Sequence, residues 1–172
     1  MKYIVLSDTH RYNKYAEIVI EKYIDDIKGV IHLGDMVDDA KHLKYKYPNL
    51  EFHYISGNND FDFTVSYEKK LKINGKKILI THGHRQRVNM GTVTISYWAS
   101  ENMADAVLFG HTHTPLCIFD AGVYIFNPGS ISFPRGIDRP TFGFMDITDD
   151  GRISFEVYKI EENGEVLKIG AV

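Results

Sequence analysis

The chain has 172 residues, with 20 basic and 23 acidic side chains, a formal net charge of −3 and a composition that is 44% hydrophobic. A chain of this size and composition folds around its own apolar core without a disulfide or a structural metal. The balanced charge and the lack of a basic run argue against an extended nucleic-acid surface and against a membrane partner.

Cysteine content and the apolar segments bear on the compartment. Cys117 is the only cysteine, so no internal disulfide can form and a reducing compartment is expected. The apolar start at Tyr3–Leu6 is much shorter than a signal-peptide core, and no apolar run reaches the ~18 residues of a membrane span. We therefore expect a cytoplasmic protein and, because no repeat or linker is visible, a single domain over residues 1–172.

The first third of the chain alternates short apolar runs with segments of helical periodicity. Strands are expected over residues 3–6, 30–33 and 52–55, and helices over residues 16–27 and 40–47, with Gly29 and Pro48 as stops. This β-α-β-α-β order predicts a parallel sheet.

The rest of the chain favours antiparallel pairs and further short strands. Asn74-Gly75 lies between two apolar segments and predicts a tight hairpin. A second hairpin is expected between 142–147 and 153–160, a helix near the end of 88–103, and strands over 106–109, 117–119 and 124–126. The prediction is an α/β architecture of two mixed sheets packed face to face, with helices outside.

Five polar clusters each follow a predicted strand directly. They are Asp8-Thr9-His10, Gly34-Asp35, Gly57-Asn58-Asn59-Asp60, His82-Gly83-His84 and Gly110-His111-Thr112-His113. Such residues are often only turn formers and caps. Five clusters at strand ends, however, converge on one crevice of an α/β sheet. Their two carboxylates, one amide oxygen and four imidazoles suit two adjacent metal sites that share a bridging carboxylate.

A pair of divalent ions about 3.5–4 Å apart would serve phosphoester hydrolysis, because it supplies a nucleophile at neutral pH and offsets charge on phosphate. Nitrogen and oxygen ligands without thiolate favour Mn²⁺, Fe²⁺, Ni²⁺ or Zn²⁺ over calcium or copper(I). We expect two divalent ions, with Mn²⁺ as the first choice.

In order along the chain, Asp8-x-His10, Gly34-Asp35, Gly57-Asn58-x-Asp60, His82 and Gly110-His111-x-His113 resemble the five-block signature of calcineurin-like metallophosphoesterases. The short chain, Thr81–His84 and Asn127–Ser130 are similar to the single-domain YfcE-type phosphodiesterase branch. The resemblance implies a four-layer αββα sandwich. It also implies one metal on Asp8, His10 and His113, a second on Asn58, His82 and His111, and a bridge by Asp35 together with a nucleophilic hydroxide.

Asn59 departs from many relatives, which carry a histidine after the metal-binding asparagine. An amide cannot act as an acid, and a positioned acid contributes about 10²–10⁴ in rate, so esters with good leaving groups are expected. We interpret Asn59 as a catalytic and substrate-binding donor to a phosphate oxygen. The alternative is a turn residue beside Asn58.

Two further residues are candidates for substrate binding. His84 follows His82 by two residues and is either a partner in the cleft, a substitute acid or an exposed loop imidazole. Arg135 can pair with a phosphate or remain a surface charge. The aromatic residues Tyr97, Trp98 and Phe133 either stack on a base or belong to the core or a subunit contact.

These observations favour a phosphodiesterase that hydrolyses a small phosphodiester by in-line attack of a metal-bridging hydroxide. The alternatives are a nuclease or nucleotide phosphatase, or a protein-interaction scaffold that retains the metal site. The fold of the resembled family is also used by a retromer subunit that serves as a protein-interaction platform with degraded metal positions, whereas no ligand position is degraded here. The expected partner is a small phosphoester, and assembly into a homo-oligomer is left open.

Overall fold

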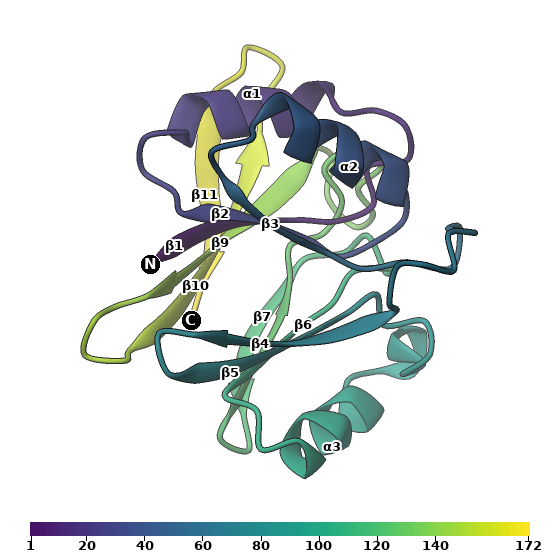
Figure 1. The fold of residues 1–172 in the computed structure, drawn as a ribbon, viewed down its shortest axis with the longest axis vertical. Helices are drawn as coiled ribbons and strands as arrows, with labels where there is room; N and C mark the ends of the chain where they lie inside the picture. Colours follow the sequence, from purple (N-terminus) through teal and green to yellow (C-terminus); the bar gives the residue numbers. More distant parts are fainter.

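The computed structural model describes residues 1–172, which form eleven strands and three α-helices (Figure 1). The strands of the first sheet are β1 (Lys2–Leu6), β2 (Gly29–His32), β3 (Glu51–Tyr54), β9 (Thr141–Ile147), β10 (Ile153–Ile160) and β11 (Val166–Ala171). The strands of the second sheet are β4 (Glu68–Ile73), β5 (Lys76–Thr81), β6 (Ala106–Leu108), β7 (Leu116–Asp120) and β8 (Val123–Asn127).

Both sheets are mixed. The first has the order β11-β10-β9-β1-β2-β3, with β1, β2 and β3 parallel as predicted. The second has the order β4-β5-β6-β8-β7, with β5, β6 and β8 parallel. Each sheet therefore gathers the carboxyl ends of three parallel strands at one edge, where α/β sheets place ligands.

The main core lies between the two sheets. Alternate side chains of both sheets meet there, among them Ile31 and Leu33 from the first sheet and Ile78 and Leu108 from the second. The ring of Phe126 stacks on that of Phe155 at a centroid distance of 4.7 Å and joins β8 to β10. Burial of each such side chain contributes roughly 1.5–3 kcal/mol, so this layer fixes the two sheets against each other.

The helices cover the outer faces of the sheets (Figure 1). Helices α1 (Lys14–Tyr23) and α2 (Val37–Lys46) pack on the first sheet, where Val19 and Leu43 join one apolar cluster with Ile4. Helix α3 (Val93–Glu101), after the short 3₁₀ helix η1 (Val88–Met90), packs on the second sheet through Ile95. The predicted four-layer αββα sandwich is confirmed.

The expected elements differ from the observed ones in two places. Helix α1 ends at Tyr23, although the apolar stripe continues to Ile27, because Ile27 reaches the core from the turn before β2. Strand β11 was not predicted, since its side chains at the sheet edge are largely exposed and show little alternation. No helix of residues 1–172 has the length and hydropathy that a membrane crossing requires.

Candidate metal centre

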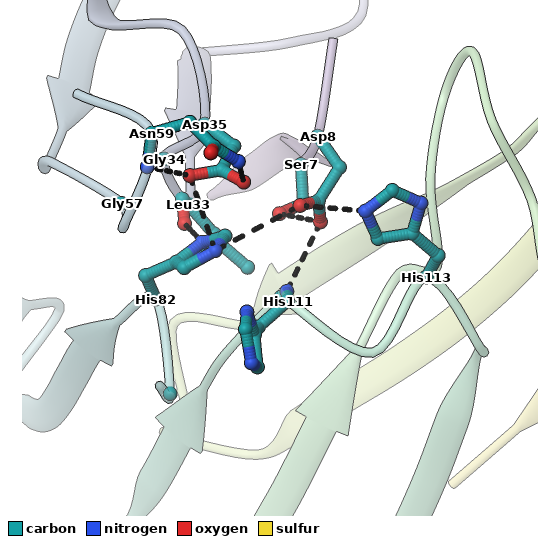
Figure 2. Close-up of polar contacts among 12 residues, drawn as sticks. Ser7, Asp8, Leu33, Gly34, Asp35, Gly57, Asn59, His82, His111 and His113 are labelled. Carbon is teal, nitrogen blue, oxygen red and sulfur yellow. Dashed lines mark hydrogen bonds and ion pairs between the residues drawn. The ribbon is translucent and has the colours of Figure 1, made fainter. Parts of the chain in front are cut away.

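The five polar clusters meet at the carboxyl ends of the parallel strands (Figure 2). Asp8 follows β1 and Asp35 follows β2, whereas His82 follows β5 and His111 follows β6. The first sheet therefore supplies the carboxylates, and the second sheet supplies imidazoles that face them.

The ligand-bearing turns use backbone conformations that most residues avoid. Positive φ angles occur at Asp8 (57°), His10 (47°), Asp35 (54°), His111 (67°) and His113 (60°). Asp and His tolerate this left-handed region better than most residues, but each instance still costs about 1 kcal/mol or more. The Asp8 turn is held by Ser130 and Ser132, whose hydroxyls donate to its carbonyl at 2.9 and 2.8 Å.

Two glycines leave room for the carboxylates. A Cβ on Gly110 would lie 1.9 Å from Ser7 Oγ, and a Cβ on Gly57 would lie 2.1 Å from Asp35 Oδ1. Both distances are far below van der Waals contact. These positions of the motif therefore require glycine because a carboxylate loop passes directly over the backbone.

One group of candidate ligands consists of Asp8, His10 and His113, whose donor atoms lie within 4.8 Å of one another. His113 Nε2 is 3.2 Å from Asp8 Oδ1 and 3.2 Å from His10 Nε2. This group coincides with the ligand set that the family resemblance implies for the first metal.

A second group consists of Asp8, Asp35 and His82. His82 Nε2 lies 3.4 Å from Asp35 Oδ1 and 3.8 Å from Asp8 Oδ1. The other oxygen of Asp35, Oδ2, lies 3.9 Å from His10 Nε2. The two oxygens of Asp35 thus face histidines of both groups.

Two buried polar atoms at the centre have no hydrogen-bond partner, Asp8 Oδ1 and His82 Nε2. An unsatisfied buried polar atom costs about 1–3 kcal/mol, more where the group is charged. A divalent cation between a carboxylate and neutral imidazoles would satisfy both atoms with ligands that borderline metals accept. The donor set therefore fits a metal site.

Backbone carbonyls orient two of the histidines. His82 Nδ1 donates to the carbonyl of Leu33 at 2.7 Å, and His113 Nδ1 donates to that of Phe133 at 2.6 Å. With Nδ1 so occupied, Nε2 of each ring faces Asp8 and is the nitrogen that can bind a metal once its proton is lost.

His111 is held differently. Its Nε2 lies 2.8 Å from Nδ2 of Asn89, in η1, and its backbone N–H donates to Asp8 Oδ2 at 3.1 Å. With Nδ2 as the donor, Nε2 accepts and a neutral ring carries its proton on Nδ1; Nδ1 becomes a metal ligand only when the Asn89 amide is turned so that its Oδ1 accepts from Nε2–H. Asn89 lies in a short segment without a motif, so no sequence pattern marks it as a site residue.

Burial and nearby polar or charged groups shift the pKa values of Asp8 and Asp35 in opposite directions. Burial alone would raise the pKa of Asp8, but the nearby His113 and His82 rings hold it below its usual range. Burial likewise opposes ionisation of Asp35, whereas His82 and Asn59 lower its pKa. Both groups are carboxylates at neutral pH, the form that binds a cation.

The loop after β3 carries two asparagines, of which one contacts a carboxylate of the centre. Asn59 donates to Asp35 from its side chain at 2.6 Å and from its backbone at 3.0 Å. Asn58 is exposed on this loop, as is Asn59, and only Asn59 is hydrogen-bonded to Asp35. The neighbouring Asp60 accepts hydrogen bonds from the backbone of Gly57 and Val37, at 2.8 and 2.7 Å, and so ties the loop to the start of α2.

The two other substrate-binding candidates lie at the edge of the centre. The ring of His84 lies 5.5 Å from that of His82, and burial, followed by the charges of His82 and His111, lowers its pKa to about 4, so the ring is neutral at pH 7. Arg135 is exposed, its backbone N–H donates to the carbonyl of His113 at 2.9 Å, and it lines a hollow next to His10.

A four-layer sandwich that gathers carboxylates and imidazoles at these strand ends has the architecture of a metallophosphoesterase. The family model of the calcineurin-like phosphoesterase superfamily domain matches residues 1–150. The chain therefore belongs to the calcineurin-like phosphoesterase superfamily.

Individual relatives agree with this assignment. The chain is 30% identical over 164 residues to a phosphodiesterase of Methanocaldococcus jannaschii, with 85% of this chain and 93% of the relative covered. The crystal structure of a predicted phosphoesterase from Streptococcus pneumoniae matches with a TM-score of 0.81 and 29% identity, covering 99% and 95% of the two chains. Zinc-bound wild-type Vps29 from Entamoeba histolytica has a TM-score of 0.81 at 20% identity, covering 100% and 98%, and so shares the fold.

Proposed function

We propose that the protein is a dinuclear metal-dependent phosphodiesterase that hydrolyses a small phosphodiester. The observation that carries the proposal is the position of Asp35, whose two oxygens face His10 and His82, one histidine from each ligand group. A carboxylate so placed suits a bridge between two ions. The diesterase name of the Methanocaldococcus relative supports the type of ester.

The proposed ligands are those that the family resemblance implies. Asp8, His10 and His113 hold one ion, Asn58, His82 and His111 hold the other, and Asp35 contacts both. Mn²⁺ is the proposed metal, with Fe²⁺, Ni²⁺ and Zn²⁺ as alternatives. When bound, such a pair supplies a hydroxide nucleophile for in-line attack at neutral pH and offsets the negative charge of the phosphoryl group.

The remaining polar residues would bind and orient the ester. Asn59, now hydrogen-bonded to Asp35, offers an amide donor for a phosphoryl oxygen beside the metals. The neutral His84 ring has a buried Nδ1 without a partner, and Arg135 presents a guanidinium at the rim. In this proposal Asp35 and Asn59 touch the reacting group, whereas His84 and Arg135 set its position.

A small substrate suits the charge of the chain better than a nucleic acid. The net charge of −3 and the absence of a basic stripe disfavour a nuclease, for which affinity would fall steeply with salt. The unpartnered His82 Nε2 suits a metal ligand both in an enzyme and in a scaffold that retains the metal site, so turnover is the measurement that separates the two. We further propose one domain over residues 1–172 and, from its lone cysteine, a cytoplasmic location.

The test is turnover of bis(p-nitrophenyl) phosphate by protein stripped with EDTA and then given Mn²⁺. We expect metal-dependent hydrolysis, about two metals per chain by elemental analysis, and a loss of at least 100-fold in kcat for Asp35→Asn. Asp38→Asn, an exposed carboxylate on α2, is the control and should retain activity. Two bound metals without turnover on a panel of diesters and monoesters would favour the scaffold.

A further inference from the structure

A hollow of about 600 Å³ opens beside His10 and His113, on the side of the proposed first metal. The segment Ser132–Arg135, which follows the Asn127–Ser130 turn, forms its other wall. The hydroxyl of Ser132 is occupied, because it donates to the carbonyls of Asp8 and Thr9. The wall therefore offers a ligand two main groups, the ring of Phe133 and the guanidinium of Arg135.

The backbone of Phe133 is anchored beside the metal centre, and the residue is 56% exposed. Its N–H donates to Ser130 Oγ at 2.8 Å, and its carbonyl accepts the bond from His113 Nδ1 at 2.6 Å. Its ring meets that of His10 at a centroid distance of 5.7 Å and an angle of 68°. An exposed aromatic surface fixed in this way loses little conformational entropy when a ligand stacks on it.

Arg135 provides charge on the same wall. The nearby Arg139 forms ion pairs with Glu161 and Glu162, whereas Arg135 forms none. Its guanidinium is thus available for a phosphoryl oxygen, to which it can donate two hydrogen bonds.

We propose that this hollow is the subsite for a planar aromatic substituent of the phosphodiester, an aryl group or a nucleobase that stacks on Phe133. Arg135 contacts the phosphoryl group at the same time. The inference rests on the proposed function, because it places the phosphoryl group at the metals, and it names the class of substrate. Phe133 is then a specificity-determining residue and takes no part in the chemistry.

Binding of two phosphonates to metal-loaded protein, measured by calorimetry, tests the subsite without turnover. Phenylphosphonate and methylphosphonate present the same anion to the metals and differ in the ring. We expect phenylphosphonate to bind at least fivefold more tightly, the low end of what stacking on an aromatic side chain contributes. Adenosine 5′-phosphorothioate is the third ligand, and tighter binding than that of phenylphosphonate assigns the subsite to a nucleobase.

Substitutions separate the effect of the Phe133 ring on binding from any effect on the fold. In Phe133→Leu the ratio of the two phosphonate affinities should fall to about one, whereas Phe133→Trp should keep or increase it. Phe119→Leu changes a phenylalanine of similar exposure, 55%, on β7 and should leave the ratio unchanged. Arg135→Gln should weaken both phosphonates by a similar factor.

The outcomes distinguish the two proposals. Equal binding of both phosphonates by the unchanged protein, or a ratio that survives Phe133→Leu with the metal content intact, overturns the subsite and leaves the phosphodiesterase proposal standing. Absence of metal-dependent binding of either phosphonate overturns both.

Discussion

His111 differs from His82 and His113 in the kind of group that fixes its ring. His82 and His113 donate from Nδ1 to main-chain carbonyls, whereas Nε2 of His111 contacts Asn89. Main-chain partners cannot be removed by substitution, but Asn89 can. The structure thus provides one place where the orientation of a ligand depends on a single replaceable side chain.

Asn89→Ala should weaken the binding of one of the two proposed metals, because His111 loses the partner that fixes its ring. Removal of such a supporting contact typically costs 10–100-fold in metal affinity. Calorimetric titration of the metal-free protein with Mn²⁺ measures this directly. Asn163→Ala, in the turn before β11, is the control and should leave both affinities unchanged. Two unaltered binding steps in Asn89→Ala would show that the contact with His111 has no such role.

Asn59→His should raise activity on esters with poor leaving groups more than on p-nitrophenyl esters. The side chain of Asn59 already reaches Asp35 at 2.6 Å, so an imidazole there lies beside the reacting group and can supply the proton that an amide cannot. We expect a gain of about tenfold or more in kcat/KM for a dialkyl phosphodiester, against little change for bis(p-nitrophenyl) phosphate. Equal effects on both substrates would mean that position 59 is not an acid site.

Among helices, strands and turns, the sequence predicts best those whose local pattern is compatible with only one conformation. Asn74 and Gly75 adopt φ angles of 47° and 82°, as their hairpin requires, and the parallel order of β1 to β3 follows from the alternation of strands and helices. Strand β11 is not predicted because an exposed edge strand shows no strict alternation of apolar and polar residues. The motifs predict candidate ligand residues but not the residues that support them, since Asn89 meets His111 only through tertiary packing.

His32, at the end of β2, makes the free energy of unfolding depend on pH. His32 is fully buried, with Gly34 N–H at 3.3 Å from its Nδ1 and Thr9 Oγ1 at 3.2 Å from its Nε2. The hydroxyl of Thr9 in turn donates to the carbonyl of Asp35 at 3.3 Å, so that His32 links the two carboxylate loops. Burial lowers the pKa of His32 to about 4, from an ordinary value of 6.5.

His32 should therefore make the metal-free protein less stable in acid. The unfolded chain binds a proton at this residue below pH 6.5 and the folded chain only near pH 4, so stability falls as the pH drops through that window. Between pH 7 and pH 5 the loss is about 2 kcal/mol. Urea unfolding in EDTA should show this drop and a smaller one in His32→Gln. Equal drops would assign the acid sensitivity to other groups.

For the molecule as a whole, the metal centre lies across the junction of the two sheets. Asp8 and Asp35 belong to loops of the first sheet, while His82, His111 and His113 belong to loops of the second. The apolar core between the sheets, with Phe126 on Phe155, brings these loops together before any ion binds. The left-handed turns and the unpartnered atoms of the centre lower the stability of the fold locally. Burial of the apolar core offsets this loss.

Metal binding should accordingly stabilise the fold as a cross-link between the sheets. An ion at 100 times its Kd contributes about 2.7 kcal/mol, which for a domain of this size raises Tm by roughly 5–10 °C. Calorimetric scans with EDTA and with Mn²⁺ measure the shift. Asp35→Asn should lose most of it and Asp38→Asn none, and Mg²⁺, which prefers oxygen ligands, should give less than Mn²⁺. A Tm that does not respond to Mn²⁺ in the unchanged protein would mean that these side chains do not form a metal centre between the sheets.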